Sequence, residues 1–431
     1  MENKIFTVAL LGVGSRGGNV YGKQMYARKD KYKIVALCDP NSEKLEYYGS
    51  LFGVPAEKRF TSEEDFFAYR LADAVVISTF DVYHARECVR AFELGYDVLL
   101  EKPVAYTEDD ALAVTQAMEQ YGRRGLVCHV LRYSPVYMKV AELLDSGAIG
   151  RLVYLDASEP VNYWHFAHSF VRGNFSTSKN AAPMIIAKCC HDLDLIQFFV
   201  KSKCDTVTSS GDLCFFKEEN APVGSSDRCV GCSALDSCPY SAKRLYIDRW
   251  KELGKKECDW PFSMLACAPL NEEKLYRAIE EGPYGRCVFR CDNDVCDIQT
   301  VNMQFENGVI ASFRATAFNQ NQSRRYLFHG TYGSVELNSE AVILNVWGKD
   351  PVIYPVSELI DKGESHGGGD VRLIDSFYDA LCGSCEGVTS LSTSMEGYFI
   401  GIAAEKSRKM GGALVKVHGD KNVSGEKRYA K

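Results

Sequence analysis

Three glycines near the start of the chain are spaced as in a loop that cradles phosphate groups. They fall in the segment Gly12-Val13-Gly14-Ser15-Arg16-Gly17, which matches the pattern GxGxxG. An apolar run at 5–11 precedes the segment and a helix-length segment at 17–30 follows it, which is the context that this motif requires. There the glycines let the backbone approach a pyrophosphate, and the first turn of the helix, with Ser15 and Arg16, supplies N–H donors. The pattern predicts a dinucleotide-binding site.

A carboxylate follows at the spacing expected for a ribose contact. Asp39 lies 22 residues beyond Gly17, directly after a second apolar run at 33–38. In this position a carboxylate accepts hydrogen bonds from the ribose hydroxyls and repels a 2′-phosphate. We therefore expect the cofactor to be NAD rather than NADP.

Lys102 stands where proton chemistry beside a bound cofactor is expected. It ends the segment DVLLEK (97–102), and ligands bind at the carboxyl ends of the strands in open parallel sheets. A lysine in a partly dry cleft can serve as a proton donor or acceptor. The next residue, Pro103, is expected to hold a turn, with a cis bond as one option, that fixes the direction of the lysine side chain.

A polar and aromatic stretch of low regularity, 163–174, is predicted to form the substrate wall. Sugar rings stack their C–H faces on aromatic rings and hydrogen-bond through their hydroxyls. The candidate contacts are Trp164, His165, His168, Arg172 and Asn174, and weaker candidates are Asp297 and His366. A surface loop with one packed tryptophan is the alternative.

Three of the seventeen cysteines are grouped, whereas most of the others stand singly in apolar contexts where a thiol acts as a small hydrophobe. Cys229, Cys232 and Cys238 form C-x2-C-x5-C in a polar stretch. Three thiolates at this spacing suit a structural Zn²⁺ ion. The available fourth ligands are Cys258, Cys267, Cys287 and Cys291. The alternatives are an Fe–S cluster, for which a nicotinamide enzyme offers no redox partner, and three unliganded thiols.

Two patterns of secondary structure must position these residues. Over the first ~125 residues, strands that are apolar throughout alternate with helices, which predicts a parallel sheet covered on both faces. After residue 150 strands follow strands, so this half is predicted to be α+β with a largely antiparallel sheet. The strands expected there are 151–158, 205–214, 295–306, 309–317, 324–330 and 334–347. We predict a doubly wound Rossmann domain at 1–127 and a second domain at 128–431 with a Cys-rich insertion at about 214–296.

The composition excludes several classes of protein. Hydrophobic residues make up 46% and charged residues 25% of the chain, as in ordinary soluble globular proteins. A net charge of −7 without a long basic block argues against a nucleic-acid or anionic-membrane partner. No window approaches the roughly 18 apolar residues of a membrane helix, and the first apolar run leads into glycines rather than a cleavage site. We expect a cytoplasmic protein.

The order of these motifs resembles the Gfo/Idh/MocA family of dinucleotide-dependent oxidoreductases, which act mostly on sugars, sugar derivatives and cyclitols. The matching strings are GVGSRG, FDVYHARECVRAFELG with His84, Glu101-Lys102-Pro103, LRYSPVYMKVAELLDSGAIGRL and CCHDLDLIQFF. The resemblance implies a Rossmann domain, a C-terminal domain with a large open antiparallel sheet, and a substrate bound between them. It also implies a homodimer or homotetramer, and it adds Thr79, His84 and Glu101 to the residues around the cofactor.

By the same resemblance, His191 is the catalytic partner of Lys102. Imidazole can move a hydroxyl proton near neutral pH while hydride leaves the same carbon. Many relatives carry an aspartate four residues before this histidine, where this chain has Ala187, and Lys188 lies three residues before it. A second lysine could bind substrate hydroxyls or act on Lys102 by like-charge repulsion, so Lys188 is a third catalytic candidate.

These features together predict an NAD-dependent oxidoreductase that acts on a CH–OH group of a sugar, sugar derivative or cyclitol. One alternative is a redox-cycling glycosidase of the same fold, which oxidises a ring hydroxyl, eliminates the aglycone, adds water and reduces the ring with retained NADH. Another is a non-catalytic dinucleotide-sensing protein. The presence of both Lys102 and His191 argues against the sensor.

Overall fold

The N-terminal part of the chain is built on a six-stranded parallel sheet in the order β3-β2-β1-β4-β5-β6. The computed structural model describes residues 4–179, 181–255, 260–266, 270–321, 323–360, 365–384 and 387–419. The strands of this sheet are β1 (Phe6–Leu11), β2 (Tyr32–Cys38), β3 (Arg59–Phe60), β4 (Ala74–Ile77), β5 (Asp97–Leu100) and β6 (Gly125–Val127). The helices between them are η1 (Ser15–Gly22), α1 (Lys23–Ala27), α2 (Ser42–Phe52), η2 (Ala56–Lys58), α3 (Glu63–Phe66), α4 (Asp81–Glu93) and α5 (Glu108–Tyr121). This is the doubly wound Rossmann topology that the sequence predicts.

Both faces of this sheet are buried, which explains why its strands are apolar throughout. Alternate side chains of a strand point to opposite faces. In β1, Val8 and Leu10 join a core that includes residues of α2 and α13 (Gly369–Cys382), and Ala9 and Leu11 join a core that includes residues of α4 and α5. Helix α13 comes from the far end of the sequence, yet it packs on the N-terminal domain.

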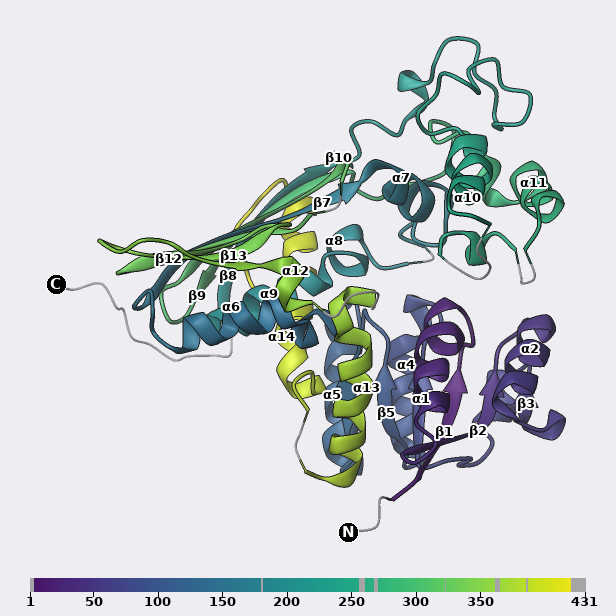
Figure 1. Cartoon of the computed structure of the whole chain (residues 1–431), viewed down its shortest axis with the longest axis horizontal. Helices are drawn as coiled ribbons and strands as arrows, with labels where there is room; N and C mark the ends of the chain where they lie inside the picture. The colour runs from purple at the N-terminus through teal and green to yellow at the C-terminus, as the bar shows by residue number, and fades with distance from the viewer. Residues whose placement is uncertain are drawn as a thin grey trace.

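The second sheet has nine strands in the order β14-β13-β12-β11-β7-β10-β9-β8-β15. All neighbours pair antiparallel except β7 and β10, which pair parallel, so the sheet is mixed and mostly antiparallel, as predicted. The strands are β7 (Leu152–Asn162), β8 (Cys204–Asp212), β9 (Ile298–Phe305), β10 (Ile310–Asn319), β11 (Arg325–Gly330), β12 (Gly333–Leu337), β13 (Ala341–Val346), β14 (Val352–Pro355) and β15 (Val415–Lys416). Figure 1 shows α6 (Pro135–Asp145), α9 (Cys190–Val200) and α14 (Leu391–Lys409) on the side of this sheet that faces the Rossmann domain.

One predicted strand is wrong, because 334–347 folds as the hairpin β12–β13. The side-chain oxygen of Asn338 accepts hydrogen bonds from the backbone N–H groups of Glu340 and Ala341, at 2.9 and 3.0 Å. This local turn competes with a continuous strand and reverses the chain. The Asn307-Gly308 turn, in contrast, joins β9 and β10 as expected.

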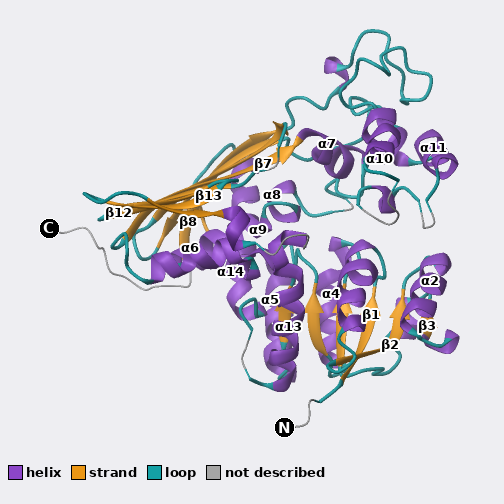
Figure 2. Ribbon diagram, in the orientation of Figure 1, coloured by secondary structure: helices purple, strands orange, loops and turns teal. Residues whose placement is uncertain are grey.

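A long insertion separates β8 from β9 and contains the grouped cysteines. Its short helices are η5 (Glu218–Asn220), η6 (Lys243–Asp248), α10 (Arg249–Glu252), η7 (Phe262–Met264), α11 (Glu272–Glu281) and η8 (Pro283–Gly285). Aromatic rings of Phe215, Phe216, Tyr240 and Phe289 pack together inside it. Figures 1 and 2 show this insertion beside α7 (Tyr163–Phe166), next to one end of the large sheet. In this view the insertion lies above the Rossmann domain.

The remaining helices are η3 (Val130–Tyr133), η4 (Ala167–Arg172), α8 (Met184–Ala187), α12 (Val356–Leu359) and η9 (Ser365–Gly368). Of these, η3 lies on the connection from the first sheet to the second, and the others lie between strands of the second sheet. Among the described residues, no helix is long and apolar enough to span a membrane.

Candidate active site

The glycine loop fits a dinucleotide pyrophosphate. Gly12 has φ +85°, and a Cβ atom there would lie 2.5 Å from the carbonyl oxygen of Ser78. A Cβ on Gly17 would lie 2.0 Å from the carbonyl oxygen of Gly12. Gly14 differs, because its φ of −80° suits any residue and a Cβ there would meet nothing within 4 Å. Protein packing therefore explains two of the glycines, and the open space at Gly14 suits the close approach of a ligand.

Asp39 holds the glycine loop in place from the end of β2. Its Oδ2 accepts a hydrogen bond from the Val13 N–H at 3.0 Å, and its Oδ1 accepts one from the Asn41 N–H at 3.0 Å. The side chain is buried next to the loop. This position agrees with the predicted ribose contact, which stays a prediction.

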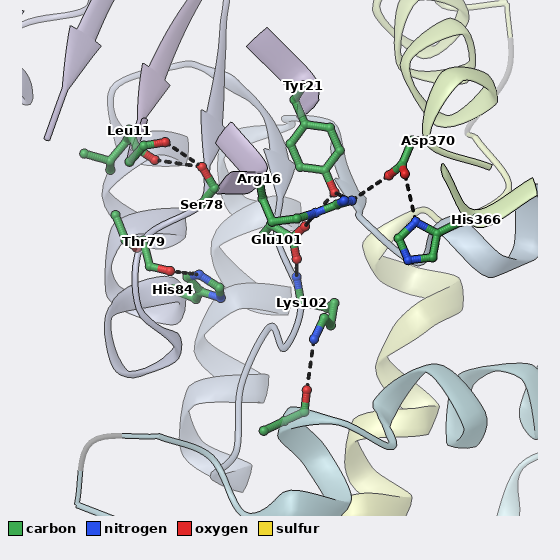
Figure 3. A network of polar contacts seen from close by, with 12 residues as sticks. Leu11, Arg16, Tyr21, Ser78, Thr79, His84, Glu101, Lys102, His366 and Asp370 are labelled. Atoms are coloured by element: carbon green, nitrogen blue, oxygen red, sulfur yellow. Dashed lines mark hydrogen bonds and ion pairs between the residues drawn. The ribbon is translucent and has the colours of Figure 1, made fainter. Parts of the chain in front are cut away.

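Arg16 binds protein carboxylates rather than pointing into solvent. Its guanidinium donates to Glu101 at 2.8 Å and to Asp370 of α13 at 2.6 Å, and Tyr21 also contacts it (Figure 3). Burial alone would raise the pKa of Glu101, but the charges of Arg16 and Lys102 hold that pKa below its ordinary value. Arg16 therefore ties the glycine loop to the end of β5 and to α13.

His84 braces the turn that follows β5. Its ring nitrogens lie 2.7 Å from the carbonyl oxygen of Pro103 and 3.2 Å from that of Thr79. Figure 3 shows the contact with Thr79. The Lys102–Pro103 peptide bond is cis. The direct contacts of His84 are with backbone groups on two neighbouring strand ends, so its influence on the cofactor site comes through their placement.

Lys102 links the Rossmann sheet to the second domain. Its Nζ donates a hydrogen bond to the carbonyl oxygen of Ala187, at the end of α8, at 2.9 Å (Figure 3). Ala187 lies four residues before His191. Lys102 at the end of β5 thus contacts the end of α8, a few residues before the helix that carries His191.

His191 is half-buried at the start of α9, and its ring lies 5.6 Å from that of His129. Burial lowers the pKa of His191 well below its ordinary value, and the positive charge of Lys102 lowers it further. Within the described part of the chain, its Nδ1 atom is buried without a hydrogen-bond partner. The imidazole is therefore neutral at pH 7 and can accept a proton.

Two aspartates of the HDLD segment fix the helix that carries His191. Asp192 accepts hydrogen bonds from Arg324 Nε and Tyr326 Oη, both at 2.8 Å. Asp194 accepts two from Arg132, at 2.6 and 2.7 Å. These carboxylates are buried and paired, so they anchor α9 to β11 and to η3. Neither arginine stands out in the sequence, because its aspartate partner lies 132 or 62 residues away.

Lys188 is buried in a charged cluster beside this anchor. Its Nζ lies 3.6 Å from Glu159, and the same carboxylate lies 2.8 Å from Arg324. Burial lowers the pKa of Lys188, against the opposing charge of Glu159. Its catalytic role stays a prediction.

The predicted substrate wall packs against the insertion. His168 hydrogen-bonds to Tyr246 at 3.0 Å and stacks on Tyr284, and burial lowers its pKa to about 3. Arg172 is buried and donates to the carbonyl oxygens of Arg286 and Tyr240, both at 2.7 Å. These two side chains hold the insertion in place.

The other members of this stretch are more accessible. The rings of Trp164 and His165 both pack against Trp260, at 5.1 and 4.7 Å, and Asn174 is half-buried. Substrate contacts by residues of 163–174 stay a prediction.

The two weaker candidates have clear structural partners. Asp297 is buried and accepts hydrogen bonds from the backbone N–H groups of Cys214 and Phe215, at 2.9 and 2.8 Å. His366 lies 2.8 Å from Asp370, the carboxylate that also holds Arg16 (Figure 3).

The prediction of a zinc ion finds no support. Among the described residues, no group of three or more His, Cys, Asp and Glu side chains is placed to hold a metal ion. Two of the proposed fourth ligands, Cys258 and Cys267, lie outside the described residues. The third and fourth, Cys287 and Cys291, stand four residues apart, and the Cys291 thiol donates to the Cys287 carbonyl oxygen at 3.2 Å.

Two family models together match most of the chain. The model GFO_IDH_MocA, described as "Oxidoreductase family, NAD-binding Rossmann fold", matches residues 6–129. The model GFO_IDH_MocA_C, described as "Oxidoreductase family, C-terminal alpha/beta domain", matches residues 141–417.

Curated relatives carry oxidoreductase names. The chain is 24% identical over 433 residues to YteT of Bacillus subtilis, which is named as an oxidoreductase, with 94% of this chain and 97% of the relative covered. It is 23% identical over 214 residues to scyllo-inositol 2-dehydrogenase (NAD(+)) of the same organism, with 49% and 58% covered.

Solved structures share the fold over almost the full length. One is the WlbA dehydrogenase of Bordetella pertussis in complex with NADH and UDP-GlcNAcA, with a TM-score of 0.67, 16% identity, and 97% and 99% of the two chains covered. Another is an oxidoreductase of Agrobacterium radiobacter in complex with NAD+, L-tartaric acid and magnesium, with a TM-score of 0.67, 17% identity, and 96% and 98% covered.

Proposed function

Because the chain belongs to the Gfo/Idh/MocA family of NAD-binding oxidoreductases, we propose that it transfers hydride between NAD and a hydroxyl-bearing ring carbon of a sugar, sugar derivative or cyclitol. The observation that carries this proposal is the hydrogen bond from Lys102 Nζ to the Ala187 carbonyl oxygen, which joins the end of β5 to the end of α8, four residues before the neutral His191. Relatives that are named for inositol, or whose structure holds a nucleotide sugar, support this substrate class.

The proton steps follow from the two side chains. The imidazole of His191 accepts the proton of the substrate hydroxyl, since the neutral ring is the form that can take it. The Lys102 ammonium group, beside the same carbon, stabilises the negative charge that develops on the hydroxyl oxygen. NAD, held by the glycine loop and Asp39, supplies the hydride acceptor. In the reverse direction His191 returns the proton.

The test is to incubate the purified protein with NAD and a panel of free sugars, cyclitols and nitrophenyl glycosides, while NADH and nitrophenol are both followed. Net NADH accumulation with a free sugar or cyclitol is the expected result. Nitrophenol release without NADH accumulation would instead establish the redox-cycling glycosidase, because that cycle returns the hydride to the substrate.

Two variants assign the residues. Lys102→Ala and His191→Ala should each lower kcat by about 10²-fold or more, the usual effect of losing an acid–base group, with NAD binding retained. Lys203→Ala removes an exposed lysine from the same domain as His191 and is the matched control. Normal turnover in either active-site variant would remove that residue from the mechanism.

We further propose that the chain forms a homodimer or homotetramer through the open face of the nine-stranded sheet. In β9 the residues alternate strictly between exposed and buried, and the exposed ones include Ile298 at the strand start. Light scattering on the purified protein measures the assembly. A monomer at micromolar concentration would contradict this proposal. The predicted cytoplasmic location stays a prediction.

A further inference from the structure

Four cysteines of the insertion converge on one cavity that the oxidoreductase site does not use. The lining of this cavity contains Cys229, Cys232, Cys238 and Cys287. The first three come from the C-x2-C-x5-C segment, and Cys287 lies about 50 residues further along the chain. All four are free thiols. The insertion thus gathers sulfur atoms from two separate segments.

Arg172 brings a buried positive charge to the same cavity. It is only 1% exposed, it lines the cavity, and its Nη2 donates a hydrogen bond to Cys229 Sγ at 3.3 Å. Its other partners are backbone carbonyl oxygens, and its Nη1 atom is buried without a partner in the described part of the chain. The hydrogen bonds of its guanidinium within the described residues thus go to two carbonyl oxygens and a sulfur, and none of these is a carboxylate. A buried guanidinium needs an anion, so the cavity is built for negative charge.

Thiolates are the anions that the lining can supply. The backbone N–H of Ala242 also donates to Cys229 Sγ, at 3.4 Å. Hydrogen bonds from N–H groups and buried positive charge stabilise metal-bound sulfur. Several thiolates packed together repel each other unless a thiophilic metal centre neutralises them.

The geometry points to an iron–sulfur cluster, and we infer that Cys229, Cys232, Cys238 and Cys287 are its four ligands. A zinc ion binds each sulfur at about 2.3 Å and so draws its ligands tightly together, which the described side chains do not do. A [4Fe–4S] core places iron and sulfide atoms between its thiolates and so holds them further apart.

The cluster's role is structural. It joins the loop at 229–238 to the segment around Cys287, and Arg172 at the end of η4 connects both to the stretch that we assign to the substrate wall. The helices of the insertion near these cysteines are short. Bonds from the four thiolates to one cluster would therefore hold the loops together where the helices cannot. This inference does not depend on the proposed oxidoreductase reaction.

The test is to purify the full chain without oxygen and to measure iron, acid-labile sulfide and zinc. We expect about four irons and four sulfides per chain, with a broad visible absorbance that bleaches on reduction. One zinc per chain without iron, iron without sulfide, or metal-free protein would each overturn the inference.

Matched variants identify the ligands. Cys287→Ala should lose most of the iron and sulfide, whereas Cys291→Ala should keep them, because Cys291 does not line the cavity. Circular dichroism and NAD binding, which depends on the other domain, show whether each variant is folded. Full iron content in Cys287→Ala, or equal loss in both folded variants, would refute the ligand assignment.

Discussion

A buried glutamate in the Rossmann domain makes the stability of the protein depend on pH. Glu87 lies on α4, and its carboxylate accepts a hydrogen bond from the Thr79 hydroxyl at the end of β4. Burial raises the pKa of Glu87 from 4.5 to about 7, although the Thr79 hydrogen bond opposes the shift. The folded protein therefore keeps this proton to a higher pH than the unfolded chain does.

The size of the effect follows from the two pKa values. Between pH 4.5 and pH 7 only the unfolded chain releases the proton, so folding stability falls by up to about 1.4 kcal/mol per pH unit. Above pH 7 both states are ionised, and the penalty levels off at about 3 kcal/mol. Glu87→Gln cannot ionise, and its side-chain oxygen can still accept the Thr79 hydrogen bond. The stability advantage of this variant over the natural protein should therefore be about 2.5 kcal/mol larger at pH 8 than at pH 5.

The assay is urea unfolding of both proteins at pH 5 and pH 8, followed by circular dichroism. Glu93→Gln changes an exposed carboxylate on the same helix, paired with Arg90, and its stability difference from the natural protein should change by less than about 0.5 kcal/mol between the two pH values. If the stability gap between Glu87→Gln and the natural protein is the same at both pH values, the reasoning about this carboxyl group is refuted.

Three further predictions concern the cofactor site and the anchor of the catalytic helix. The natural protein should bind NAD more tightly than NADP in calorimetric titrations, and Asp39→Ala should reduce the difference between the two affinities. Tighter binding of NADP by the natural protein would contradict the assignment of Asp39 as the ribose contact. Gly14→Ala should weaken NAD binding by about tenfold or more without changing Tm, whereas Gly17→Ala should lower Tm, because only the second Cβ clashes with the backbone. Asp194→Ala should lower the free energy of unfolding by about 3–5 kcal/mol, because it leaves the buried guanidinium of Arg132 unpaired. The control Glu273→Ala, which breaks an exposed ion pair, should lower it by less than about 1 kcal/mol. Equal losses in the two variants would refute the role of the buried pair.

Most elements of the fold could be predicted from the sequence because their signals are local. Apolar runs with helix-length spacers indicate a parallel sheet, and the strands β1, β2, β4 and β5 lie where these runs predict them. Helix α5 begins after Thr107, whose side chain accepts a hydrogen bond from the Asp110 N–H, as its capping pattern indicates. The hairpin β12–β13 was missed because a single asparagine side chain reverses an otherwise strand-like run.

The candidate site was predictable only in part. GxGxxG and Glu101-Lys102-Pro103 are short motifs in which each residue acts near its own position, so their places in the fold follow from the strands that they end. The sequence by itself therefore determined the Rossmann topology, the family and the position of Lys102.

Only the tertiary structure decided which charges meet. Asp194 pairs with Arg132, and Arg16 reaches Asp370 of α13 across 354 residues of sequence. The same holds for Arg172, whose type suggests a sugar contact but whose guanidinium is buried beside the cysteines of the insertion. An arginine can pair with any carboxylate or lie against any polar surface, and nothing in its sequence neighbours selects among them. The selection is made by packing, because a buried charge is stable only where the fold brings its partner within hydrogen-bond distance.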